Sequence, residues 1–186
     1  RKLGYTGGGG GSNPACNRFG YGFVQGADAA AKELGLEKGA VSVKYSYQHG
    51  ANFSASAELQ AQINGWYSNG TEVVFACGGS MFESVKSAAE ANTGAKIIGV
   101  DVDQSYASEL VITSAVKGLK ESVGKVLEQY YAGKWDADLS GKTQNLGATD
   151  NATGLPIATS RFNNFTADDY NALFTKIKNG EITPDA

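Results

Sequence analysis

Apolar residues in the first 135 positions follow two alternating periods, one typical of strands and one typical of helices. Short runs that alternate with polar residues, or that are apolar throughout, predict strands, whereas apolar residues three or four apart predict helices. The predicted strands lie at residues 3–7, 41–47, 72–77, 96–100 and 110–114. We count five strand-helix units, which predict an α/β fold with a doubly wound parallel sheet in the strand order 2-1-3-4-5.

The predicted helices have recognisable first turns. Asn13-Pro14 combines a good N-cap with the residue favoured at the first helical position, and Ser80 to Glu83 has the spacing of a capping box. The helix after the fifth strand has one apolar face, which we expect to pack inward on the sheet. That face consists of Leu119, Val123, Val126, Leu127 and Tyr130.

The strand-helix rhythm stops near Trp135, so we divide the chain into residues 1–135 and residues 136–186. The second part is rich in Gly, Asn, Thr and Asp, and it predicts short peripheral strands at residues 143–147 and 155–160. A C-terminal helix begins after Thr166, with Asp169 in the position of a capping-box partner.

Composition excludes several classes of function. The 16 basic and 19 acidic residues give a net charge of −3 with no basic cluster, which argues against a nucleic-acid partner. No apolar run approaches the roughly 20 residues that span a bilayer. Cys16, Cys77 and the single histidine, His49, have no metal-ligand or catalytic spacing, so we expect neither a metal nor a cofactor nor catalysis. The two cysteines are either small buried residues or a disulfide.

Ligands of open parallel sheets bind at the carboxyl ends of the strands, where loops and helix N-termini meet. The glycine run 7–11 lies there, but it lacks the Gly-Lys-Ser/Thr of a phosphate loop, and we interpret it as a flexible or ligand-covering loop. Gly78 and Gly79 follow the third strand, where they form either a tight turn or a place for a ligand to approach the backbone.

Charged and aromatic residues mark the same edge. Asp101 and Asp103 follow the fourth strand, and in extended chain their carboxylates would point the same way, suited to accepting hydrogen bonds from a vicinal diol. Lys117 is either a ligand donor or a solvated lysine at a helix start. The ring of Phe53 either stacks on a flat ligand or folds onto the core.

Four motifs in order resemble the basic membrane protein family, the substrate-binding lipoproteins of ABC transporters that include PnrA-type purine-nucleoside receptors. They are Phe19-Gly-Tyr-Gly-Phe23, Glu72-Val-Val-Phe-Ala-Cys-Gly-Gly79, Ile97-Ile-Gly-Val-Asp-Val-Asp-Gln104 and Thr113-Ser-Ala-Val-Lys117. The resemblance implies the second, C-terminal lobe of a type I periplasmic-binding protein, without catalysis, anchored by lipid outside the cytoplasm and delivering a nucleoside to ABC permease subunits.

The resemblance also implies roles for individual residues. Asp101 and Lys117 would hold the ribose hydroxyls, Gly78 and Gly79 would let the ligand approach the backbone, and Phe53 would be the loop aromatic. Asp103 would then be a turn or supporting residue. The family's first lobe has no counterpart in this sequence, so the chain would hold half of a site. A ligand-sensing regulatory domain on the same fold is the alternative.

Overall fold

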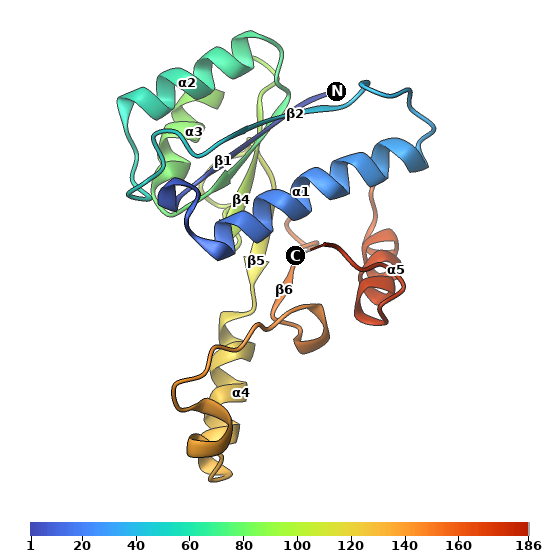
Figure 1. Ribbon diagram of the computed structural model, residues 1–186. Coiled ribbons are helices and arrows are strands. Elements are labelled where there is room, and N and C mark those ends of the chain that lie inside the picture. Colours follow the sequence, from blue (N-terminus) through green and yellow to red (C-terminus); the bar gives the residue numbers. More distant parts are fainter. Residues whose placement is uncertain (186) are drawn as a thin grey trace.

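A computed structural model describes residues 1–185 and shows a mixed α/β fold built on one six-stranded sheet (Figure 1). The strand order is β2-β1-β3-β4-β5-β6, and the first five strands are parallel, which confirms the predicted order. The strands are β1 (Lys2–Gly7), β2 (Ser42–Ser46), β3 (Val73–Cys77), β4 (Lys96–Asp101), β5 (Val111–Lys117) and β6 (Thr153–Gly154).

The helices are α1 (Pro14–Glu33), α2 (Ala57–Ser68), α3 (Met81–Glu90), α4 (Leu119–Tyr131) and α5 (Ala167–Lys178). α1 packs on one face of the sheet and α2 and α3 on the other, whereas α4 and α5 have no buried residue among those described. The Asn13 side chain accepts hydrogen bonds from two backbone N–H groups of the first turn of α1, and Thr166 and Asp169 form the expected capping box of α5. The prediction of a capping box at Ser80 was wrong. Ser80 is itself in a helical conformation, and its hydroxyl donates to the Phe53 carbonyl instead.

The core has two layers, one on each face of the sheet. On one face, residues of α2 and α3 such as Leu59, Ile63 and Met81 are fully buried against the sheet. On the other face, α1 covers Tyr5 and Phe75, and the Tyr5 hydroxyl donates to the carbonyl of Cys16 over 2.6 Å. These two layers hold the carboxyl ends of β1, β3 and β4 in fixed positions.

Two predicted connections differ from the structure. The prediction of five strand-helix units was wrong at the fourth strand, because β4 and β5 are joined by the loop 102–110 without a helix. The second departure concerns α4, which extends away from the sheet and has no buried residue among those described (Figure 1). Its predicted inner face is instead exposed: Leu119, Val123, Leu127 and Tyr130 have about half of their surface accessible (53%, 59%, 48% and 52%).

The predicted peripheral strands are mostly turns. Residues 143–147 form no strand, and residues 155–160 form turns in which the hydroxyls of Thr159 and Ser160 donate to the Pro156 carbonyl. The short strand β6 lies between these segments and pairs antiparallel with the end of β5. Hydroxyl side chains satisfy the local backbone, which removes the need for a ladder partner. Within residues 1–185, none of the helices has the length and apolarity needed to cross a membrane.

Candidate ligand-binding site

A cleft of about 100 Å³ lies at the carboxyl ends of β3, β4 and β5, beside the first turns of α1. All five residues that the sequence singled out line it, although they come from four separate segments. The complete lining is Asn13, Ala15, Cys16, Phe19, Phe53, Cys77, Gly78, Gly79, Val100, Asp101 and Lys117. Phe19 on α1 was not expected there. Cys16 and Phe19 are three residues apart, so helical spacing puts them on one face.

A larger cavity of about 430 Å³ lies at the opposite end of β4 and β5. Its main charged group is Arg161, which already donates to the carbonyls of Val111 and Ser105 and pairs with Glu109. Because this guanidinium is engaged by the protein itself, the smaller cleft is the better candidate for ligand binding.

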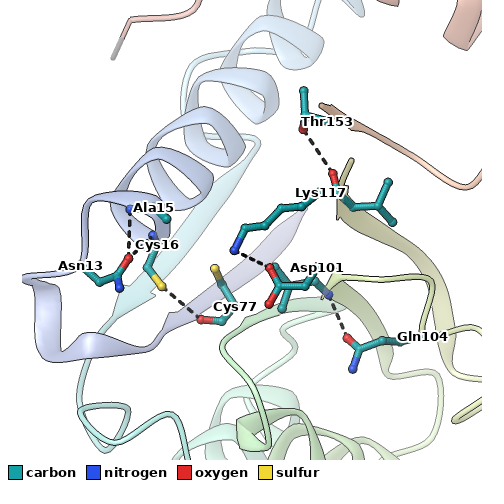
Figure 2. A network of polar contacts seen from close by, with 10 residues as sticks. Asn13, Ala15, Cys16, Cys77, Asp101, Gln104, Lys117 and Thr153 are labelled. Carbon is teal, nitrogen blue, oxygen red and sulfur yellow. Dashed lines mark hydrogen bonds and ion pairs between the residues drawn. The ribbon is translucent and has the colours of Figure 1, made fainter. Parts of the chain in front are cut away.

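Asp101 and Lys117 face each other across neighbouring strands, with 2.6 Å between the Lys117 Nζ and the Asp101 Oδ1 (Figure 2). Both side chains are partly exposed, at 41% and 39%. The contact is an ion pair without hydrogen-bond alignment at Oδ1, and this oxygen is buried. Because the side chain as a whole is partly exposed, the acceptor capacity that a ligand can reach lies at the other carboxylate oxygen, Oδ2.

The loop after β4 is held by Gln104. The side-chain oxygen of Gln104 accepts from the Val100 backbone N–H over 2.9 Å, and the backbone N–H of Gln104 donates to the Ser114 hydroxyl over 3.0 Å. Asp101 lies at φ 68°, in the left-handed region that non-glycine residues seldom adopt. Such strain concentrates at functional sites, and here it turns the Asp101 carboxylate toward Lys117.

Asp103 points elsewhere, so the expectation that both carboxylates share a direction was wrong. Its oxygens accept from the Ser105 N–H over 2.9 Å and from the Thr159 hydroxyl over 2.6 Å. Partial burial acts to raise the pKa of Asp103, but these hydrogen bonds and the charge of Arg161 together lower it. Asp103 is thus a turn residue that ties the loop to the segment near residue 159.

Aromatic rings border the charged pair. The Lys117 ammonium lies 5.5 Å from the centre of the Phe19 ring, within the range of a cation–π contact. Phe53 lies at φ 57°, and its ring packs on Gly8 and Gly78 while still lining the cleft. Phe53 thus packs on the glycine turn and also lines the cleft, while its stacking on a flat ligand stays a prediction.

The glycine run forms a hydrogen-bonded turn. Gly8 N–H donates to the Cys77 carbonyl over 2.9 Å, and Gly9 N–H donates to the Gly50 carbonyl over 3.0 Å. A Cβ on Gly8 would collide with the Phe53 ring, and a Cβ on Gly78 would lie 2.8 Å from the Met81 sulfur. The glycines are needed because backbone and rings approach so closely here.

Cys16 and Cys77 are both buried free thiols beside the cleft, and the Cys16 sulfur lies 3.8 Å from the Cys77 carbonyl oxygen (Figure 2). Burial raises the pKa of the Cys77 thiol to about 12, and the Cys16 and Asp101 side chains nearby add to the shift. The Cys77 thiol is therefore protonated near neutral pH, unlike catalytic or metal-binding thiolates.

The cleft offers binding groups rather than reactive ones. It has a single carboxylate and no histidine, and residues 1–185 contain no group of three or more His, Cys, Asp or Glu placed to hold a metal. One paired Asp and Lys, two aromatic rings and glycine backbone suit a small ligand that has hydroxyls and a flat face.

Comparison with known families gives a match along the described chain. The sequence model of the family described as "ABC transporter substrate-binding protein PnrA-like" matches residues 1–185. Basic membrane protein B of Borreliella burgdorferi is 29% identical over 161 residues, covering 84% of this chain and 43% of that protein. The ABC transporter nucleoside-binding protein BmpA of Lactococcus lactis is 27% identical over 199 residues, covering 98% of this chain and 52% of that protein. The chain thus spans about half the length of these curated relatives.

Solved structures share the fold. An ABC transporter solute-binding protein from Aeropyrum pernix K1 has a TM-score of 0.71 at 20% identity, covering 98% of this chain and 56% of that one. A transcriptional activator of the comK gene from Bacillus halodurans has a TM-score of 0.66 at 16% identity, covering 99% of this chain and 58% of that one. At such identities the likeness concerns the fold alone.

Proposed function

Because this chain belongs to the PnrA-like family of ABC transporter substrate-binding proteins, we propose that its cleft is one wall of a nucleoside-binding site. The family consists of binding proteins rather than enzymes. The observation that carries the proposal is the pairing of Asp101 with Lys117 beside Phe53 in one cleft. A nucleoside has a diol and a flat base, which match these groups.

The charged pair fits a ribose diol. The Asp101 carboxylate can accept from two adjacent hydroxyls, and Lys117 can donate to one of them while offsetting the carboxylate charge. A hydrogen bond to a charged group contributes roughly 1.5–3 kcal/mol. Phe53 supplies an aromatic edge for the base, and Gly78 and Gly79 let the ligand approach the backbone.

The cleft is only one side of a site. Its volume of about 100 Å³ is well below the roughly 300 Å³ at which small-molecule pockets begin. The chain also spans 43% and 52% of two curated relatives, so the facing wall belongs in our proposal to a further lobe. The exposed apolar face of α4 supports this arrangement, since apolar patches mark places where another part packs. In this proposal α4 packs on that further lobe, while β6 returns to the sheet of the binding lobe. The boundary at residue 135 stays a prediction.

The proposed setting is that of a transport receptor. The protein would bind its nucleoside outside the cytoplasm, held at the membrane by a lipid anchor, and would present the ligand to ABC permease subunits. This rests on the family and on the nucleoside-binding name of the Lactococcus lactis relative.

A ligand-sensing regulatory role is the second candidate, because a transcriptional activator has the same fold. Both roles use the same cleft and differ in location. A receptor is recovered with the membrane or outer fraction of its cells, whereas a transcriptional regulator is recovered with the cytoplasm.

A titration followed by two-dimensional amide NMR tests the ligand class, because it detects the weak binding that half a site gives. Inosine or adenosine should shift the amide signals of Gly78, Gly79, Asp101 and Lys117, with a Kd near the millimolar range. The matched 2′,3′-dideoxynucleoside lacks the diol and should leave the signals of Asp101 and Lys117 in place. Equal shifts with both ligands would contradict the diol assignment, and no shift with any nucleoside up to about 10 mM would count against nucleoside binding.

A further inference from the structure

The two cysteines are the only ones in the chain, and the fold brings them together from 61 positions apart. Cys16 lies in the first turn of α1, and Cys77 is the last residue of β3. The Cys16 side chain points at the backbone of Cys77, and both residues are more than nine-tenths buried (Figure 2). Both also line the cleft beside Asp101.

The residues around Cys16 and Cys77 do not indicate a catalytic or metal-binding role for these thiols. Residues 1–185 contain no group of three or more His, Cys, Asp or Glu placed to hold a metal, and no histidine lines the cleft to activate a thiol. Two thiols that meet in this way between a helix and a strand have a different chemistry open to them, which is oxidation to a covalent link.

We propose that Cys16 and Cys77 form a modification site at which an intrachain disulfide fastens α1 to β3 at the edge of the cleft. The structure shows the reduced form, in which both thiols are free. The oxidant's availability rests on the extracytoplasmic setting of the proposed function, but the reaction depends only on the contact between the two residues and not on the identity of the ligand.

The reaction is thiol-disulfide exchange. One cysteine thiolate attacks an external disulfide, such as oxidised glutathione, and forms a mixed disulfide while one thiol leaves. The second cysteine thiolate attacks the protein sulfur of that mixed disulfide, which forms the Cys16–Cys77 bond and releases a second thiol. The protein loses two protons and two electrons, and the external disulfide gains them. Because burial raises the pKa of Cys77, exchange should be fast while the chain folds and slow afterwards.

The link would close a loop that contains most of α1, all of β2 and α2, and Phe53. It would therefore limit the movement of the helix that carries Phe19 relative to Gly78 and Gly79. Cross-linking a loop of this length restricts the unfolded chain, so the oxidised protein should melt at a higher temperature.

The test is refolding of residues 1–186 from denaturant, once with a mixture of oxidised and reduced glutathione and once with excess reductant. Free thiols are then counted by alkylation and mass measurement under denaturing conditions. We expect the oxidised sample to be monomeric, to have lost two hydrogens and to take up no alkylating reagent. Its Tm should lie roughly 5–15 °C above that of the reduced sample and should fall to the reduced value after reduction in denaturant and refolding.

Cys16→Ser and Cys77→Ser are the controls, and each should have the same Tm under both conditions. The wild-type comparison with and without reductant needs no variant, so it decides the question even if a variant folds poorly. Two alkylated thiols after oxidative refolding, glutathione left on the protein, or dimers linked between chains would each overturn the proposal. None of these outcomes depends on nucleoside binding, so failure here and failure of the proposed function can be told apart.

Discussion

The role of Asp101 can be tested by replacing it with asparagine, which changes one charge and little else. Asp101 adopts φ 68°, and asparagine tolerates this left-handed conformation as well as aspartate does, whereas alanine adds roughly 1–2 kcal/mol of strain. The lost ion pair with Lys117 is partly exposed on both sides, so it contributes at most about 1 kcal/mol to folding. Asp101→Asn should therefore fold normally, with a Tm close to that of the wild type.

Binding should respond differently. Asp101→Asn removes a hydrogen bond to a charged group, worth roughly 1.5–3 kcal/mol, which corresponds to a loss of about 10- to 150-fold in nucleoside affinity. The assay is the amide NMR titration, with the wild type and the variant compared at the same nucleoside concentrations. The spectrum of the free variant also reports directly on whether the fold is kept.

Glu72→Gln is the matched control, because it also converts an ion-paired carboxylate to an amide. Glu72 pairs with Arg1 over 2.8 Å at the opposite end of the sheet from the cleft. This control should keep wild-type affinity. If Asp101→Asn kept a folded spectrum and bound the nucleoside as tightly as the wild type, Asp101 would not be the diol acceptor and the reasoning would be refuted.

Two further predictions concern stability. The double variant Val123→Lys, Leu127→Lys should keep the wild-type Tm of this chain within about 2 °C, because both side chains are exposed and lysine is a good helix former. A fall in Tm of more than about 5 °C would show that α4 packs on the sheet. Hydrogen bonds lower the pKa of Asp103 in the folded protein, so the ionised carboxylate stabilises the fold. This contribution to stability should be fully present above about pH 4, the ordinary pKa of an unfolded carboxyl, and should be lost as the pH falls through the lower folded pKa. Asp103→Asn should thus lower the Tm at pH 7 more than at pH 3, and equal effects at both pH values would argue against that contribution.

Local patterns account for most of the fold. Asn13-Pro14 and Thr166 begin helices as their capping chemistry predicts, and the short apolar runs form the five parallel strands. Caps and periodicity act within a few residues, so they can be recognised without knowing the neighbours. The edge of the sheet that carries the cleft also follows, because the carboxyl ends of parallel strands always meet on one side.

Packing between distant segments decided what those patterns left open. The apolar stripe of α4 predicted a helix correctly, but periodicity says only that a face is apolar and not whether this chain covers it. Phe19 joined the cleft because α1 lies against the end of β3, a contact across about 60 residues that no local pattern encodes.

Asp101 and Asp103 show most clearly what the sequence determines and what the tertiary structure decides. By itself the sequence determined that carboxylates follow the fourth strand at the edge where ligands bind. The tertiary structure decided which one faces the cleft: the left-handed turn at Asp101 directs its carboxylate toward Lys117, while Thr159 and Ser105 engage Asp103. Extended chain would have aligned the two side chains, but a single reversal of φ, stabilised by Gln104 and Ser114, separated them.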